Sequence, residues 1–273
     1  MTEPAPLRDI IKRYGLGARK SLGQHFLLDR NLCARIARTA GDLTGVHVIE
    51  IGPGPGGLTR ALLDTGAETV SAVEMDTRCV EALAELRDAY PKRLKIVEAD
   101  ALETDVTALS PAPRRIVANL PYNVATPLLL GWLGQIGEFE SLTLMFQKEV
   151  VDRLAAEPGG KTYGRLSVLV QWLCEVRFEF NVSKQVFTPP PKVASSIVTL
   201  TPRPQPLAPA ERNKLEAVTA MAFGQRRKML RSSLKPLNLD FDALGITPTA
   251  RAEELTVEQF CAIARSVAGT VTG

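Results

Sequence analysis

The glycine-rich segment at residues 52–57 constrains the fold of this chain more than any other feature. It has the sequence Gly-Pro-Gly-Pro-Gly-Gly, follows an apolar run over residues 46–51 and precedes a helical pattern over residues 58–63. An apolar run, a glycine turn and an amphipathic segment are typical of a buried strand that turns directly into a helix. The sequence therefore predicts a strand, a tight turn and a helix here.

Strand-like runs alternate with helical patterns over the first 200 residues. We expect strands over residues 46–51, 69–74, 94–97, 115–119, 141–146, 175–181 and 194–201. We expect helices over residues 7–14, 32–40, 76–89, 128–133, 148–155 and 165–174. This alternation predicts an α/β fold built on a doubly wound sheet.

A proline-rich segment at residues 201–206 separates this region from the rest of the chain. Its prolines exclude a helix or a central strand, so it is interpreted as a linker. Helical patterns follow over residues 211–223, 226–234, 239–244 and 257–268. The sequence thus predicts two domains, an α/β domain at residues 1–203 and a small α-helical domain at residues 204–273.

The glycine turn also suggests a cofactor. Gly52, Gly54 and Gly57 have the Gly-x-Gly-x-x-Gly spacing, which fits either a nicotinamide dinucleotide or S-adenosylmethionine. Both prolines of the turn lack the backbone N–H groups that a pyrophosphate would need, and Glu50 places a negative charge beside the site. These features favour S-adenosylmethionine, with Gly52 and Gly54 as candidate contacts.

Acidic residues follow the next two expected strands. Glu74 lies about 20 residues beyond the glycine turn, where a carboxylate accepts the ribose hydroxyls in this architecture. We therefore expect Glu74 to bind the cofactor's ribose. Met75 could pack on its adenine, although core packing explains a methionine equally well. Asp100 could accept the adenine amine or, alternatively, cap a helix.

The segment most informative about chemistry is Asn-Leu-Pro-Tyr at residues 119–122. The lone pair of a nucleobase amine is delocalised into the ring, so a catalyst must draw it toward a methyl donor. The Asn119 side-chain oxygen and the Leu120 carbonyl can each accept one N–H of the amine, and Pro121 keeps Leu120 extended. Tyr122 offers a face on which an extruded base can stack. A simple strand-ending turn is the alternative.

Five ordered motifs resemble those of the ribosomal RNA adenine dimethyltransferase family. They are Gly-Gln-His-Phe-Leu at 23–27, Glu-Ile-Gly-Pro-Gly at 50–54, Asn-Leu-Pro-Tyr at 119–122, Phe-Thr-Pro-Pro-Pro-Lys-Val at 187–193 and Phe-Gly-Gln-Arg-Arg-Lys at 223–228. The resemblance covers nearly the whole chain and is greatest to the bacterial small-subunit (16S) enzymes. It implies a Rossmann-like class I methyltransferase fold, with S-adenosylmethionine bound by residues 1–203 and RNA by residues 204–273.

The resemblance also implies roles for individual residues. It implies that the cofactor pocket is lined by His25, Leu27, Gly52, Glu74, Asp100 and Asn119. It implies that Asn119, Tyr122 and Phe187 surround the target adenine. The family usually has Asn at the position of His25, where a neutral imidazole can still donate or accept a hydrogen bond. A histidine satisfied at a loop surface is the alternative.

The net charge of +3 is distributed unevenly along the chain. Residues 184–235 contain ten Lys and Arg against two Asp and Glu, and residues 1–30 contain six against three. Such asymmetry is typical of a nucleic-acid-binding surface. We expect a broad basic face that binds RNA phosphates, formed by Arg226, Arg227, Lys228, Arg231 and Lys235. A merely solvated helix is the alternative.

Other functional classes find no support in the sequence. No apolar run reaches the roughly 18 residues of a membrane span, and the N-terminus lacks signal-peptide features, so we expect a cytoplasmic protein. Four scattered cysteines and two histidines suggest neither a disulfide framework nor a metal site. A monomer is the default expectation.

These patterns predict in-line methyl transfer from S-adenosylmethionine to N6 of adenine. Such transfer needs positioning and amine acceptors rather than a strong base. The resemblance implies dimethylation of two adjacent adenines near the 3′ end of 16S rRNA in the immature small subunit. The alternatives are a large-subunit rRNA methyltransferase of the macrolide-resistance type, a non-catalytic ribosome-assembly or RNA-binding factor on the same fold, and a nicotinamide dehydrogenase.

Overall fold

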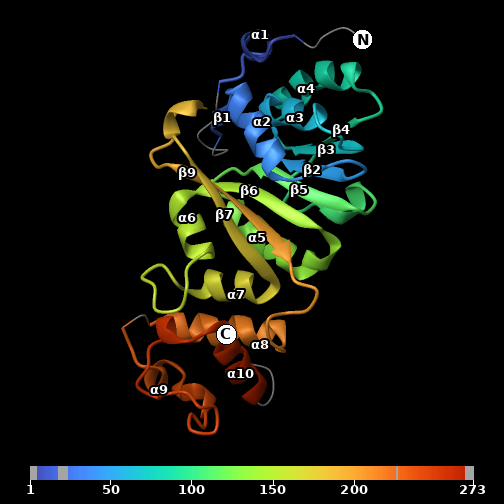
Figure 1. Cartoon of the computed structure of the whole chain (residues 1–273). Helices are drawn as coiled ribbons and strands as arrows, with labels where there is room; N and C mark the ends of the chain where they lie inside the picture. The colour runs from blue at the N-terminus through green and yellow to red at the C-terminus, as the bar shows by residue number, and fades with distance from the viewer. Residues whose placement is uncertain (1–4, 18–23, 226, 268–273) are drawn as a thin grey trace. The chain divides into compact units, whose positions relative to one another are not determined.

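The computed structural model describes residues 5–17, 24–225 and 227–267 of the 273-residue chain. Its larger sheet has the strand order β4-β3-β2-β5-β6-β9-β7, and β1 pairs with β8 in a separate two-stranded sheet (Figure 1). The strands are β1 (Phe26–Leu27), β2 (His47–Ile51), β3 (Thr69–Glu74), β4 (Leu94–Glu98), β5 (Arg114–Asn119), β6 (Ser141–Gln147), β7 (Cys174–Val182), β8 (Phe187–Thr188) and β9 (Ser195–Pro202). The α-helices are α1 (Leu7–Arg13), α2 (Arg30–Thr39), α3 (Gly57–Leu63), α4 (Thr77–Ala89), α5 (Ala125–Trp132), α6 (Lys148–Leu154), α7 (Arg165–Leu173), α8 (Arg212–Phe223), α9 (Leu230–Ser233) and α10 (Val257–Ser266). Short 3-10 helices lie at Val106–Leu109, Leu133–Glu138, Lys184–Val186, Lys235–Leu237 and Ala252–Glu254.

Strands β2 to β6 form a parallel sheet, which confirms the predicted doubly wound architecture. β2 pairs in parallel with both β3 and β5, and the pairs β3–β4 and β5–β6 are parallel as well. β9 then adds to β6 in the antiparallel direction. The strand order reverses between β2 and β5, and ligands of open α/β sheets bind beyond the carboxyl ends of the strands at such a switch point.

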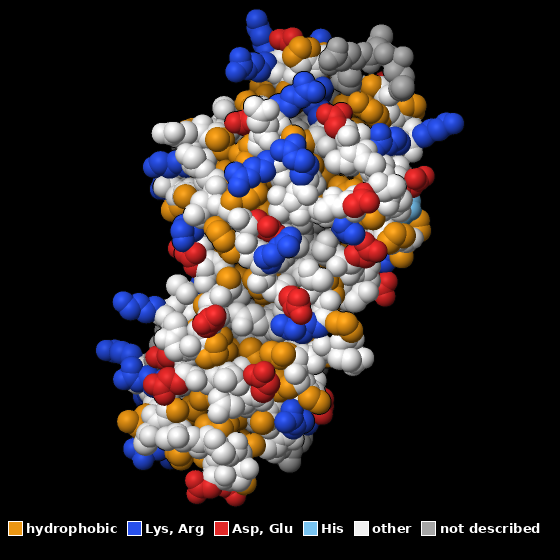
Figure 2. Space-filling view, viewed as in Figure 1, with side chains coloured by type: hydrophobic (Ala, Val, Ile, Leu, Met, Phe, Trp, Pro, Cys, Tyr) orange, Lys and Arg blue, Asp and Glu red, His pale blue; other side chains and the backbone are white. Residues whose placement is uncertain are grey.

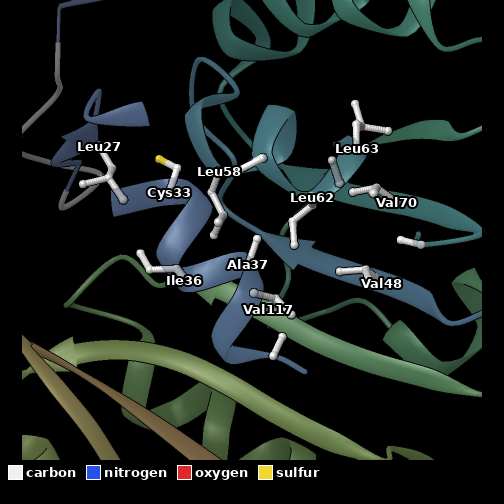
Figure 3. Packing of buried hydrophobic residues seen from close by; sticks show 14 of the residues in the cluster. Leu27, Cys33, Ile36, Ala37, Val48, Leu58, Leu62, Leu63, Val70 and Val117 are labelled. Atoms are coloured by element: carbon white, nitrogen blue, oxygen red, sulfur yellow. The ribbon is translucent and has the colours of Figure 1, made fainter. Parts of the chain in front are cut away.

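Helices α2 and α3 cover this part of the sheet with an apolar layer (Figure 3). Ile36 and Ala37 from α2 and Leu62 from α3 belong to one core cluster with Val48 of β2 and Val117 of β5. Each of these five residues is at most 1% exposed. Burying a side chain such as Leu or Val contributes about 1.5–3 kcal/mol, so this packing holds α3, and the glycine turn that precedes it, in a fixed place.

The chain divides into two compact units. One consists of residues 1–148 and 177–202, and the other of residues 149–176 and 203–273. The sequence-based boundary near residue 203 coincides with the last of these divisions, whereas α6 and α7 group with the C-terminal helices. Within the second unit, the Phe223 ring lies 6.1 Å from that of Tyr163 and 5.4 Å from that of Phe260. This aromatic cluster links the segment just before α7 to α8 and α10.

Two of the predicted C-terminal helices are wrong in whole or in part. The helix was expected over residues 226–234, of which Arg226 lies outside the described residues. Residues 227–229 form a turn and a bridge, and among residues 227–234 only Leu230–Ser233 are α-helical. The segment 239–244 forms a single turn. The Asp240 side chain caps its start by accepting the Ala243 N–H, and Gly245, with a φ of 65°, ends it. One isolated turn is too short to propagate as a helix.

Candidate active site

A cleft opens at the carboxyl ends of β2, β3 and β5, at the switch point of the sheet. Its volume, including the open mouth, is about 690 Å³. Most of the residues predicted as site residues line it, namely His25, Leu27, Gly52, Gly54, Glu74, Met75, Asn119, Leu120, Pro121 and Tyr122. Met75 is 53% exposed, which excludes the alternative that it is a core residue.

The glycine turn forms the floor of the cleft and depends on its glycines. Gly52 and Gly54 have φ angles of 66° and 55°, which side chains rarely adopt. A Cβ atom on Gly52 would lie 3.2 Å from the Pro121 ring, and one on Gly54 would lie 3.1 Å from the Phe26 ring. The turn therefore packs directly against both the 119–122 segment and β1.

Glu74 is buried and fixes the geometry of the turn. Its Oε2 atom accepts the Gly54 N–H, and its Oε1 atom accepts the N–H groups of Met75 and Asp76, each at 2.9 Å. Burial raises the pKa of Glu74, while these backbone bonds oppose the shift. A carboxylate has about four lone-pair sites, so this arrangement leaves capacity for about one further donor.

Glu50 is buried in the same cleft with an unsatisfied oxygen. It is 1% exposed, and its Oε2 atom has no hydrogen-bond partner among the described residues. Burial raises the pKa of Glu50 to about 8, and the neighbouring Glu74 adds to the shift. Among the described residues, the cleft lining contains two carboxylates and neither Lys nor Arg. A positively charged ligand fits this environment, and a pyrophosphate does not.

Asn119 and Tyr122 are held in defined orientations. The Asn119 amide nitrogen donates to the backbone carbonyl of His25 at 3.3 Å. Since a carbonyl can only accept, the amide nitrogen must face it, and the Asn119 Oδ1 atom is left to face away. The Tyr122 hydroxyl bonds the Ser195 hydroxyl at 2.5 Å, and burial raises the Tyr122 pKa. One edge of the Tyr122 ring is thereby anchored to β9.

His25 lies between the aromatic residues of the site. Its Nδ1 atom is 2.8 Å from the Pro189 carbonyl and therefore carries the proton, which leaves Nε2 as an acceptor in the neutral ring. The His25 ring lies 5.4 Å from that of Tyr122 with an interplanar angle of 33°. It also meets the Phe187 ring edge-on at 6.5 Å. His25 is thus a cleft residue with defined partners, which contradicts the alternative of a surface-loop histidine.

Two predicted site residues do not line the cleft in this structure. Phe187 is 2% exposed and pairs with Leu27 across the β1–β8 sheet, so its ring is a wall behind His25 rather than an open face. Asp100 lies two residues beyond β4, and its side chain accepts the Leu102 N–H at 2.9 Å. This local turn resembles the capping alternative. Either residue would have to rearrange to contact a ligand in the cleft.

The comparison with protein families identifies the group to which this geometry belongs. The model of the ribosomal RNA adenine dimethylase family matches residues 15–269. The chain belongs to this family.

Curated relatives of this dimethylase cover nearly all of its length. It is 63% identical to ribosomal RNA small subunit methyltransferase A of Paramagnetospirillum magneticum over 98% of this chain and 96% of the relative. It is 62% identical to the protein of the same name from Rhodospirillum rubrum, over 97% of this chain and 94% of the relative. The dimethylase chain is therefore an rRNA methyltransferase.

Solved structures share the dimethylase fold. A dimethyladenosine transferase from Plasmodium falciparum has a TM-score of 0.75 and 25% identity, over 88% of this chain and 96% of that chain. The 23S rRNA methyltransferase ErmE has a TM-score of 0.67 and 29% identity, over 89% of this chain and 99% of that chain. These matches confirm the class I methyltransferase fold and exclude the dehydrogenase alternative.

Sequence reasoning missed a clamp beside the cleft of this dimethylase. Asp76 is 4% exposed and accepts both the Gln24 amide at 3.0 Å and a two-pronged bond from the Arg78 guanidinium. Arg78 lowers the pKa of Asp76 to about 2. Gln24 precedes His25, so the clamp ties the β3–α4 loop to the segment that holds Asn119. The Gly-Gln-His motif, which contains Gln24, was the feature of the sequence that could have indicated this clamp.

The predicted basic face lies in the second unit. Arg227, Lys228 and Arg231 are exposed, and none of them forms an ion pair with a described carboxylate. Figure 2 shows basic side chains at the edge of this unit over the segment between α8 and α9. Arg226 lies outside the described residues.

The described ranges contain no group of three His, Cys, Asp or Glu side chains placed to hold a metal ion. In the same part of the chain, none of the helices combines the length and the apolar character that crossing a membrane requires.

Proposed function

We propose that this chain binds S-adenosylmethionine in the cleft and dimethylates N6 of two adjacent adenines near the 3′ end of 16S rRNA in the immature small subunit. The observation that carries the proposal is the orientation of Asn119. Its amide nitrogen is committed to the His25 carbonyl, so its oxygen is the atom that remains to accept an amine N–H at a negatively charged cleft.

The cleft fits the charge of the proposed cofactor, which would supply a methyl carbon made electrophilic by a sulfonium. Glu50 has a buried oxygen without a partner, and a cationic group beside it would satisfy that oxygen. Gly52 and Gly54 permit close approach along the floor. Glu74 retains room for a ribose hydroxyl, and the exposed Met75 could cover the adenine of the cofactor.

The target amine would be held by two acceptors. The Asn119 Oδ1 atom and the Leu120 carbonyl would each take one N–H of the adenine amine and draw its lone pair out of the ring. Tyr122 would stack on the extruded base, an interaction worth about 1–3 kcal/mol. After transfer, the proton of the methylated amine leaves to water. The same pocket must then readmit the monomethylated amine for the second transfer.

The role of Phe187 in this proposal changes with the geometry. Because its ring packs behind His25, we assign it the task of fixing the imidazole and the end of β1. Contact between Phe187 and the target base would require His25 to move first. Asp100 stays a proposed acceptor for the cofactor's adenine amine, provided that it releases the Leu102 N–H.

The choice of the small subunit is supported by the relatives. Proteins 62–63% identical to this chain carry the small-subunit name, whereas the large-subunit enzyme ErmE is 29% identical. Arg226, Arg227, Lys228 and Arg231 would bind phosphates of the ribosomal substrate. Action on a ribosomal precursor would place the protein in the cytoplasm, where a monomer would suffice.

The direct test uses isotope-labelled S-adenosylmethionine and small subunits that lack the modification. After incubation, the RNA is digested and the labelled nucleosides are mapped by mass spectrometry. The proposal expects N6,N6-dimethyladenosine at two neighbouring positions near the 3′ end. Label on another base, or on large subunits alone, would contradict it, and binding without label would favour a non-catalytic assembly factor.

A further inference from the structure

A second and larger cavity lies in the first unit, away from the residues of the methyl-transfer proposal. Including its open mouth, it has a volume of about 1880 Å³, against about 690 Å³ for the cleft. We name it the α2–α3 groove, because Arg30, Ala34 and Arg38 of α2 and Arg60 and Ala61 of α3 line it. α1 and the C-terminal end of α4 complete its rim.

Four arginines border the groove. Arg8, Arg30, Arg38 and Arg60 all line it, and none of them forms an ion pair with a described carboxylate. Figure 2 shows basic side chains over the region of α2, with apolar surface between them. By contrast, Arg13, Arg78 and Arg115 elsewhere in the same unit are all paired.

Arg60 carries an unsatisfied donor inside the groove. Its Nε atom is buried and has no acceptor among the described residues. Burial lowers the pKa of Arg60, while Tyr90, Asp64 and Glu85 oppose the shift and Arg30 adds to it. An anion beside Arg60 and Arg30 would fill the free N–H and bind both guanidinium groups.

Two carboxylates also line the groove, and they do not cancel its positive charge. Asp42 accepts the Thr44 N–H at 2.9 Å, and Asp64 lies at the C-terminal end of α3 near Arg60. Four arginines against two aspartates leave the lining with a net charge of +2. The groove therefore attracts an anion, and its two carboxylates limit the number of phosphates that it can bind.

The remaining lining suits a nucleotide rather than a free phosphate ion. Cys33, Ala34, Ala37 and Ala61 provide a floor of small apolar side chains. Tyr90, at the end of α4, is half-buried at the rim and can stack on a base. A nucleotide would use both parts of the lining, with its phosphate beside Arg30 and Arg60 and its base over this floor.

We infer that the α2–α3 groove is a second contact site for ribosomal RNA, which takes a phosphate and the attached nucleoside of a single-stranded segment. This inference rests on the proposed function, because the substrate of that function supplies the RNA. It adds a binding site on the unit that carries the catalytic cleft, in addition to the basic face of the second unit.

The test measures binding of the full-length chain to immature small subunits at several salt concentrations. The variant Arg30→Gln/Arg38→Gln changes two exposed side chains and should not affect folding, which a thermal melt verifies. Each lost phosphate contact lowers the slope of log affinity against log salt by about 0.7–0.9. For the one phosphate of this site, we expect the slope to fall by about 0.7–0.9 and the dissociation constant to rise roughly 5- to 20-fold. Arg60→Gln should act in the same direction.

The matched control is Arg87→Gln/Lys92→Gln, which removes two exposed charges of the same unit outside the groove. It should leave the affinity and slope unchanged. Equal behaviour of the groove and control variants would overturn the inference. The inference would also be overturned if the groove variant lost affinity for subunits but kept its affinity for protein-free 16S rRNA. That result would indicate that the groove binds a ribosomal protein.

A titration with 5′-AMP distinguishes RNA from a free nucleotide. Tight 5′-AMP binding that is lost in the groove variant, with RNA affinity unchanged, would contradict an RNA site. Failure of the proposed function has a different signature, because the wild-type protein would then transfer no methyl groups to adenine. If the wild-type protein methylates adenine normally and the groove variant binds RNA with normal affinity, this inference is contradicted and the proposed function is not.

Discussion

The amide nitrogen of Asn119 donates to the backbone carbonyl of His25 across 94 residues of chain, at 3.3 Å. This bond sets which end of the Asn119 side chain faces away from β1. His25 is in turn positioned by the Pro189 carbonyl and the Tyr122 ring. The 23–27 and 119–122 motifs therefore form one structural unit, and the acceptor geometry of Asn119 depends on both.

Tyr122 should act mainly through its ring. Tyr122→Ala removes the stacking face, so we expect kcat/KM to fall by about 5- to 150-fold, corresponding to about 1–3 kcal/mol. Tyr122→Phe keeps the face and loses only the bond to Ser195, at a cost of about 1 kcal/mol in the free energy of unfolding. Steady-state methylation and denaturant unfolding of both variants check this. If Tyr122→Phe were as inactive as Tyr122→Ala, the hydroxyl rather than the stack would be responsible.

Glu50 should make the cofactor-free protein less stable as the pH rises. Its pKa is raised from 4.5 to about 8 by burial, so the folded state retains a proton that the unfolded chain releases. This contribution is fully present below pH 4.5 and is lost as the pH approaches 8. Glu50→Gln removes it, so the variant should gain in Tm relative to wild type between pH 5 and 8.

Thermal melts across that pH range provide the measurement. The control is Glu81→Gln, an exposed position on α4 that should keep a constant difference from wild type. Parallel curves for wild type and Glu50→Gln would show that the Glu50 carboxyl titrates normally. The same variant should bind S-adenosylmethionine more weakly, because a cationic ligand favours the ionised form of the Glu50 carboxyl and glutamine has no such form.

Glu74 should matter chiefly for cofactor affinity. Glu74→Gln weakens a charged acceptor that also orders the N–H groups of Gly54, Met75 and Asp76. Hydrogen bonds to charged groups contribute about 1.5–3 kcal/mol, so we expect the dissociation constant of S-adenosylmethionine to rise roughly 10- to 100-fold. Calorimetry checks this, with the exposed Glu68→Gln as control. Unchanged affinity would refute the ribose role.

The basic face of the second unit should determine RNA affinity without affecting the cofactor. Changing Arg226, Arg227 and Lys228 together to Gln should lower the salt slope of binding to small subunits by about 2–3, since each phosphate contact contributes about 0.7–0.9. Cofactor affinity should stay constant. Changing Arg87, Lys92 and Lys95 to Gln removes the same charge elsewhere. An identical effect of both triple variants would mean that only net charge matters.

Much of the sheet could be predicted because central strands such as β2, β3 and β6 are buried on both faces. The seven expected strands match β2 to β7 and β9 within one residue at each end, since a buried parallel strand appears as a short apolar run. β1 and β8 were missed because two-residue strands show no periodicity. The turn at residues 239–244 was misjudged because helical spacing alone cannot reveal the local bond of Asp240.

The site was predictable where residues act through their position along a strand. Glu74 and Asn119 end β3 and β5, the two strands that flank β2 in the parallel part of the sheet, so their placement at the same edge follows from topology. The burial of Phe187 and the clamp between Asp76 and Gln24 depend on contacts between distant segments. Nothing in a single sequence specifies those contacts. The unpaired arginines of the α2–α3 groove were missed for the same reason.

The measurement that most directly tests the role of Asn119 is single-turnover methyl transfer by Asn119→Ala. Cofactor and RNA affinities are measured in parallel, and Asn213→Ala, an exposed position on α8, serves as control. Removing one preorganised hydrogen-bonding group of this kind costs about 10²- to 10³-fold in rate. We predict a loss of that size, with RNA affinity nearly unchanged and dimethyladenosine formation abolished. Transfer at close to the wild-type rate would contradict the assignment of Asn119 as an acceptor of the adenine amine.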